Sequence, residues 1–123
     1  MTTYFVKATV SESGKHASCS YYTDYDCTVP FTGCLCIPYG EAQCTITQGA
    51  SSALQLVGGA FKTIDNPTGM TSANFAPAIG QTVYVPMPTE QHVTKGVILL
   101  FAQPGVVTSL YASADPQIQN DGG

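Results

Sequence analysis

The stretch VILLFA, residues Val97 to Ala102, is the longest uninterrupted apolar run in this chain. It lies within a segment from Val93 to Gln103 that ends at Pro104-Gly105, so it has the length of a strand. Both alternating sets of side chains are apolar as far as Phe101, which predicts a central strand covered on both faces that forms the core. The run is too short to cross a bilayer, because a membrane-spanning helix needs about 20 apolar residues.

Several other segments alternate apolar and polar side chains with a period of two, which is typical of strands with one buried face. In Tyr4–Val10, for example, the even-numbered residues share the apolar face. Gln48–Ala60 leaves two alternatives open, since Ser51 could cap a short helix but Gly58-Gly59 equally fits a strand with a bulge. Beside the run at 93–103, the segments that we expect to form strands are 4–10, 17–25, 42–47, 82–85 and 107–112.

Size and composition indicate a single β-rich domain. The chain has 123 residues, and its 12 Gly and 8 Pro interrupt long helices. About seven short strands at spacings of roughly 10 to 15 residues, without βαβ alternation, predict an all-β fold: a small antiparallel sandwich or barrel with a disulfide-stapled loop region. We expect one β domain over residues 1–114 and a flexible C-terminal tail over 115–123, because the tail shows no burial pattern.

All five cysteines lie in a subregion that spans residues 19–44. Such a cluster predicts either disulfide bridges or a metal site, because both stabilise a segment with few core residues of its own. The odd count leaves one thiol that is buried, free or paired with another chain. We expect disulfides within or between chains, formed by Cys19, Cys27, Cys34, Cys36 and Cys44.

Zinc is the main alternative for these cysteines, since His16, Cys19, Cys34 and Cys36 supply four ligands of suitable type. Their spacing does not match the paired Cys-x(2–4)-Cys hooks that structural zinc sites usually present. The sequence therefore favours bridges over zinc and predicts no metal and no other cofactor.

The sequence contains no recognisable catalytic motif. Only His16 and His92 could serve as the usual general base, and neither lies in a nucleophile context such as Gly-x-Ser-x-Gly. Asp24-x-Asp26, with Glu41 nearby in sequence, is a weak calcium signal and is more typical of a solvated acidic loop. We therefore expect a protein that is not an enzyme and has no catalytic residues.

Four tyrosines gather in or beside the cysteine-rich region. Packing around the disulfides would explain them, but so would a face that binds sugar or protein, because tyrosine provides rigid amphipathic contact area. Both explanations stay open. The residues of this candidate binding face are Tyr21, Tyr22, Tyr25 and Tyr39.

The charge balance excludes some partners. Four Lys, no Arg and eight acidic residues give a net charge of -4, so no cationic surface is available for nucleic acid or for an anionic membrane. Met1–Lys7 lacks the pattern of a secretory signal. We therefore expect synthesis in a cytosol and later release into oxidising surroundings, where bridges would close.

Together these features favour a structural or assembly protein that docks on copies of itself or on a larger protein lattice, as a homo-oligomer. A virion surface component, such as the decoration (cement) protein of a tailed-phage capsid, is made in the host cytoplasm and released in a particle, which fits by analogy of class. Thr2–Val10 is the strand that we expect to be available for edge pairing with a neighbour. The alternative is an extracellular binding module, lectin-like or an inhibitor, that is rich in disulfides and lacks its signal peptide here.

Overall fold

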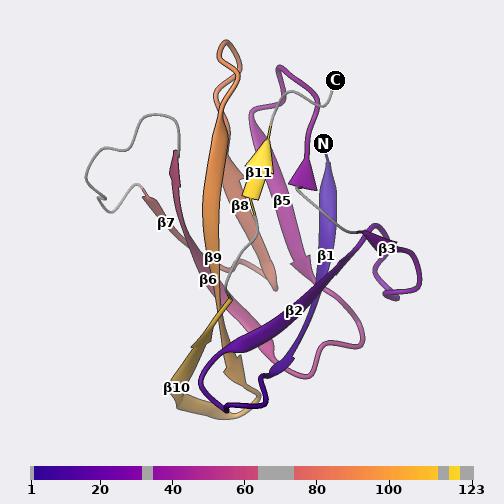
Figure 1. Ribbon diagram of the computed structural model, residues 1–123, viewed down its shortest axis with the longest axis vertical. Coiled ribbons are helices and arrows are strands. Elements are labelled where there is room, and N and C mark those ends of the chain that lie inside the picture. Colours follow the sequence, from indigo (N-terminus) through magenta and orange to yellow (C-terminus); the bar gives the residue numbers. More distant parts are fainter. Residues whose placement is uncertain (1, 32–34, 64–73, 114–116, 120–123) are drawn as a thin grey trace.

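A computed structural model describes residues 2–31, 35–63, 74–113 and 117–119, and Figure 1 shows their arrangement. These residues form eleven strands in two sheets and no α-helix. The all-β fold class is therefore confirmed.

The first sheet consists, in spatial order, of β3 (Pro30–Phe31), β2 (Ala17–Tyr22), β1 (Thr3–Val10), β5 (Gln43–Gln48) and β8 (Thr82–Pro86). The strands predicted from alternation at β1, β5 and β8 are thus confirmed, and β2 is confirmed as far as Tyr22, three residues short of the predicted end. β5 runs parallel to β1, which requires the long crossover that the chain makes between them.

The second sheet consists, in spatial order, of β4 (Leu35–Cys36), β11 (Gln117–Gln119), β9 (Thr94–Gln103), β6 (Gln55–Thr63) and β7 (Phe75–Pro77), and β10 (Val106–Ala112) also pairs with β9. β11 is parallel to β4, so both sheets are mixed and the expectation of an antiparallel fold is wrong. Both parallel pairs join segments that are far apart in the chain. Local alternation does not predict which distant strands pair, nor in which direction they run. Among the described strands the order of each sheet is open, so neither closes into a barrel.

The inner faces of the two sheets share one hydrophobic core. Val6 and Ile46 enter it from the first sheet and Leu99 from the second, and all three are fully buried. Gly59 of β6 marks a close approach of the two sheets. A Cβ at this position would lie 3.3 Å from side-chain carbons of both Val83 and Leu99.

β1 is a central strand rather than an edge strand. It is paired on one side with β2 and on the other with β5, so its backbone groups are used inside the sheet. The expected edge pairing of Thr2–Val10 with a neighbouring molecule is therefore wrong. Alternation identifies which face of a strand is buried, as it does here, but not the strand's position in its sheet.

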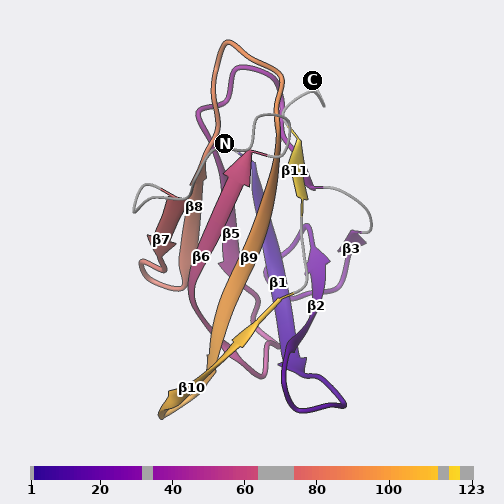
Figure 2. The same ribbon diagram turned by 60° about the vertical axis from the view of Figure 1, so that its left-hand side comes forward.

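β9 is central in the second sheet, as predicted, and Figure 2 shows it beside β6. It pairs with β6 on one side and with β11 and β10 on the other. The face that carries Ile98 is only partly covered, however. Val97, Leu99 and Phe101 are buried, whereas Ile98 is 46% exposed. The expectation that both faces are covered is therefore wrong.

The C-terminal segment differs from the flexible tail that the sequence predicts over 115–123. Gln117–Gln119 form β11, which pairs with β9 and β4, and Ile118 is fully buried. One apolar residue between two glutamines gives no periodic pattern, which explains why its burial is not visible in the sequence. The other residues of the segment lie outside the described ranges.

β6 contains a β-bulge, so the strand alternative for the second half of Gln48–Ala60 is confirmed over the helix. Leu56 pairs with Phe101, but Gly58 already pairs with Leu100, which leaves Val57 as the extra residue. The bulge keeps Leu56 in the core and places Val57, which is 37% exposed, at the surface.

Candidate functional site

The solvent side of the second sheet is the strongest candidate site. Backbone pairing places Phe75 of β7, Ala60 of β6 and Ile98 of β9 in one row. Successive side chains of a strand point to opposite faces, so Leu100 shares this side with Ile98, and Leu110 is opposite to the inward-packed Tyr111. We call this surface the outer face; it comprises Val57, Ala60, Phe75, Ile98, Leu100 and Leu110.

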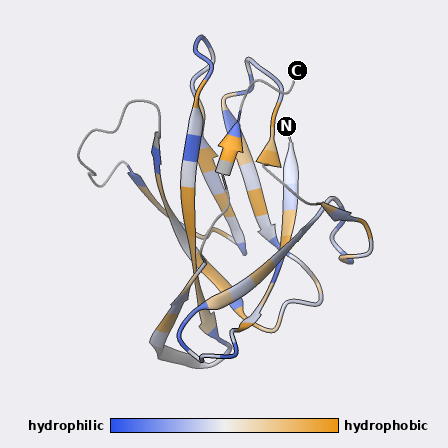
Figure 3. Cartoon of the chain, viewed as in Figure 1, coloured by the Kyte–Doolittle hydropathy of each residue, from blue (hydrophilic) through white to orange (hydrophobic). Residues whose placement is uncertain are grey.

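The outer face is apolar although it faces solvent. Phe75 is 47% exposed and Leu110 is 55% exposed, in addition to Ile98 and Val57. Figure 3 shows that β9 is hydrophilic where it begins and hydrophobic over most of its middle. These side chains together expose on the order of 400 Å² of apolar area, which is within the roughly 300 to 600 Å² of the largest apolar patch on a typical monomer, a patch that is often functional.

The outer face carries no charged side chain. The nearest charge along β6 belongs to Lys62, which pairs with Gly96 in the row beyond Ala60 and Ile98. A surface without titratable groups offers nothing for acid–base chemistry. It can, however, be buried against another apolar surface without the cost of desolvating a charge.

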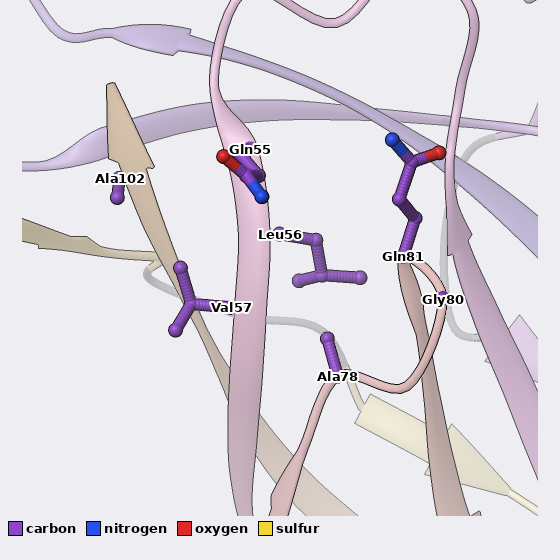
Figure 4. A pocket seen from close by; sticks show the side chains of 7 residues that line it. All are labelled: Gln55, Leu56, Val57, Ala78, Gly80, Gln81 and Ala102. Atoms are coloured by element: carbon purple, nitrogen blue, oxygen red, sulfur yellow. The ribbon is translucent and has the colours of Figure 1, made fainter. Parts of the chain in front are cut away.

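A pocket of about 430 Å³ adjoins the outer face at Val57 (Figure 4). Figure 4 shows Leu56 on the side of Gln81 and Val57 on the opposite side of β6, as the bulge requires. Gln55 and Gln81 supply the polar side-chain groups of the pocket, and none of its lining residues is titratable. The pocket can therefore offer hydrogen bonds but no acid or base.

The cysteines are spread over several elements instead of forming bridges. Cys19 lies on β2, Cys27 in the loop before β3, Cys36 on β4 and Cys44 on β5, and no disulfide joins any of the residues that the structure describes. The prediction of a disulfide-stapled region is therefore not supported. Closeness in sequence does not pair these residues, because Cys19 and Cys44 lie on different strands of the first sheet, Cys36 lies in the second sheet and Cys27 lies in a loop. Cys34 lies outside the described ranges.

Burial makes two of the thiols poor nucleophiles. Desolvation raises the pKa of Cys44 to about 12, and the Glu41 charge adds to the effect. Desolvation also raises the pKa of Cys19 to about 11, against a weaker opposing hydrogen bond with Tyr21. Because the thiolate is the reactive form, neither side chain is set up for nucleophilic catalysis near neutral pH.

Three of the four tyrosines lie on or near β2, in two different surroundings. Tyr21 packs against the core. Tyr22 is the register partner of Phe5, and the ring of Tyr25 contacts the Phe5 ring edge-on with 6.0 Å between centroids. Tyr22 and Tyr25 are thus brought together around Phe5, whereas Tyr21 belongs to the opposite side of the sheet.

The fourth tyrosine has a different neighbour. Tyr39 stacks on His92 with 4.3 Å between ring centroids, and it is 45% exposed. The other histidine, His16, lies just before β2, and its backbone N–H donates a hydrogen bond to Ser11 Oγ. The described part of the chain contains no group of three or more His, Cys, Asp or Glu side chains that could hold a metal ion.

The acidic residues considered for calcium have structural contacts. The Asp24 carboxylate accepts hydrogen bonds from the N–H groups of Thr28 and Val29 at 3.0 and 2.9 Å, and from the Thr28 hydroxyl. Glu41 accepts from the N–H and hydroxyl of Thr2, both at 2.8 Å. The side-chain bonds from Thr28 and Thr2 contribute most to lowering the pKa of these two carboxyls.

The sequence contained part of the signal for the outer face. Ile98 and Leu100 belong to the apolar run Val97–Ala102, whose pattern predicts a core strand covered on both faces. Alternation along the strand places Ile98 and Leu100 on the face opposite to Val97 and Leu99. Only the arrangement of the sheets shows that no other layer of the described residues covers that face. Nothing in the sequence marks Phe75, because it lies in a three-residue strand, which is too short to show an alternating pattern.

No helix in the described ranges is long and apolar enough to span a membrane. Neither protein-family models nor curated proteins match this chain. Since one fold can host many functions, the function has to be argued from the candidate site itself.

Proposed function

We propose that this chain is a non-enzymatic structural protein, built as a two-layer β-sandwich, that assembles through its outer face with copies of itself or with a larger protein lattice. A virion surface component, such as the decoration protein of a tailed-phage capsid, is the specific form of this proposal. The observation that carries it is the uncharged apolar outer face, with Ile98 half exposed at its centre.

The energetics of the outer face support assembly rather than display to water. Burying on the order of 400 Å² of apolar surface yields about 10 kcal/mol at about 25 cal/mol per Å². Association costs an estimated 4 to 15 kcal/mol in lost freedom of motion, so a single contact of this kind is of moderate strength. Contacts of moderate strength become durable when many copies are held on one lattice.

The charge and the thiols are compatible with the same proposal. A net charge of -4 gives the chain no affinity for the nucleic acid inside a particle. Buried thiols with raised pKa values fit a protein that is folded in a reducing cytosol before it joins the particle.

A second candidate function is favoured by one observation. Tyr39 and His92 form an exposed stacked pair, and exposed aromatic rings are suited to contacts with sugar or protein ligands. This pair would serve the alternative of an extracellular, lectin-like binding module. Under that alternative, Tyr39→Ala would abolish ligand binding and the outer face would have no role in it.

Quantitative mass spectrometry of particles tests the first proposal. Particles from the culture that carries this gene are purified on a density gradient, and the chain is quantified in the particle band and in the cleared medium. We expect the native chain in the particle band at a constant ratio to the major shell protein. Ile98→Glu should remove it from the band, whereas the matched control Tyr84→Glu, at an exposed position on the first sheet, should not. A chain that stays wholly in the medium would contradict the proposal.

A further inference from the structure

We infer that the occupant of the outer face is a second copy of this chain, stacked face to face about a two-fold axis with Ala60 and Ile98 at the centre. The inference rests on the proposed function and deepens it by naming the partner. It concerns the purified chain alone, so it can be tested without any particle.

The size of the outer face matches what a stable dimer needs. A standard interface buries about 800 Å² on each partner, of which a little over half is apolar. The outer face exposes on the order of 400 Å² of apolar area, which is close to that share. It would therefore supply the apolar centre of one standard interface, with polar residues of the surrounding strands and loops as the rim.

The charge distribution favours an uncharged partner surface. The chain carries a net charge of -4, so two copies repel each other, and this repulsion is smallest where they meet through a surface that adds no close pairs of like charges. The outer face is such a surface, and Lys62 lies at its margin. A strongly acidic or basic partner would find no opposite charges there, and its own charges would be desolvated without compensation.

The shape of the sheet also favours a copy of itself. Two sheets with the same right-handed twist stack with their strands about 30° apart and about 10 Å between the layers. In the central row the side chains are large, small and large: Phe75, Ala60 and Ile98. A two-fold axis would bring Ile98 of each copy over Ala60 of the other, so that large side chains meet small ones on both sides.

Sedimentation equilibrium of the purified chain, over concentrations up to about 100 µM, tests this inference. We expect a reversible dimer. Ile98→Glu places a charge in each half of the interface and should raise the dissociation constant at least about 100-fold. Ala60→Leu keeps the surface apolar but fills the space for the opposing Ile98, so it should also weaken the dimer. Tyr84→Glu should leave the dissociation constant unchanged.

Two results would overturn the inference. One is a wild-type chain that stays monomeric over the whole range; if Ile98→Glu is then still lost from particles, the proposed function holds and the occupant is another protein. The other is Ala60→Leu associating more tightly than wild type, which indicates unspecific adhesion. Circular dichroism and thermal unfolding check that each variant is folded. If Ile98→Glu does not fold, Ile98→Ser and Ala60→Leu decide the question.

Discussion

Burial decides what each thiol of this chain can do. Cys44 points into the core from β5 and is fully buried, whereas Cys27 lies in a partly exposed loop, where its thiol donates to the Tyr25 carbonyl. The sequence identified these residues as a cluster because it shows spacing. It could not show that neighbouring cysteines belong to different sheets and point in different directions.

The difference in burial predicts selective alkylation. In the native protein at pH 8, iodoacetamide should modify Cys27 promptly and Cys44 only as fast as the protein unfolds, because the Cys44 thiol is inaccessible and its pKa is raised to about 12. Peptide mass spectrometry after timed quenching measures both rates. Equal rates at the two positions in folded protein would contradict this account.

Gly49 and Cys27 form a second testable pair. A Cβ at position 49 would lie 2.3 Å from Cys27 Sγ and 3.3 Å from the Val6 carbonyl oxygen, so the sulfur and a side chain cannot both fit. Gly49→Ala should therefore cost about 1 to 3 kcal/mol of stability. In the background of Cys27→Ala this cost should fall by at least about 0.5 kcal/mol, as urea unfolding would measure in a double-mutant cycle. Strict additivity would show that the two positions are independent.

At the scale of elements, the strands with one buried face were predictable and the sheet order was not. β1, β5 and β8 follow from period-two alternation, because each has a solvent side and a core side. β9 was placed correctly at the centre of a sheet, but its outer side was assigned to the core. An apolar run gives no information about which element, or which partner, covers its second face.

β11 is the opposite case, because a residue that the sequence pattern leaves exposed is buried in the fold. Ile118 is surrounded by polar residues in sequence, yet it is fully buried between β9 and β4. Its burial depends on the pairing of chain segments more than 80 positions apart, such as 36 and 119, and local pattern contains no trace of that pairing.

Ile118 is accordingly expected to be a stability determinant. Ile118→Ala should lower the free energy of unfolding by about 2 to 5 kcal/mol, and Ile118→Val by only about 0.5 to 1.5 kcal/mol. Chemical denaturation of the three proteins measures both differences. A change of less than about 0.5 kcal/mol for Ile118→Ala, the range of ordinary surface substitutions, would mean that the C-terminal segment does not dock as described.

At the scale of the whole molecule, the pKa shifts determine how stability depends on pH. Cys44 and Cys19 have raised pKa values in the folded state, so the stability they contribute is fully present below their unfolded pKa of about 8.5 and is lost as pH rises toward the folded values. Asp24 and Glu41 have lowered pKa values. Their contribution is present above about pH 4 and is lost as pH falls through the folded values.

The loss of stability at high pH is the easier of the two effects to test. Between pH 8 and pH 10.5, under reducing conditions, the free energy of unfolding of the wild-type chain should fall, because the unfolded thiols ionise and the buried ones do not. Cys44→Ala has a lower stability at pH 8 but should show a shallower fall. Urea titrations at several pH values measure the slopes. Equal slopes would indicate that Cys44 ionises as readily in the folded chain as in the unfolded one.

The proposed assembly requires that the outer face be covered when the protein is in its working state. Carbene photolabelling, read by mass spectrometry, measures the accessibility of individual side chains in dilute protein and in assembled material. We predict that Phe75, Ile98 and Leu110 lose most of their labelling on assembly, while Val29 and Tyr84, which are exposed elsewhere, keep theirs. Equal labelling of the outer face in the two states would contradict the account.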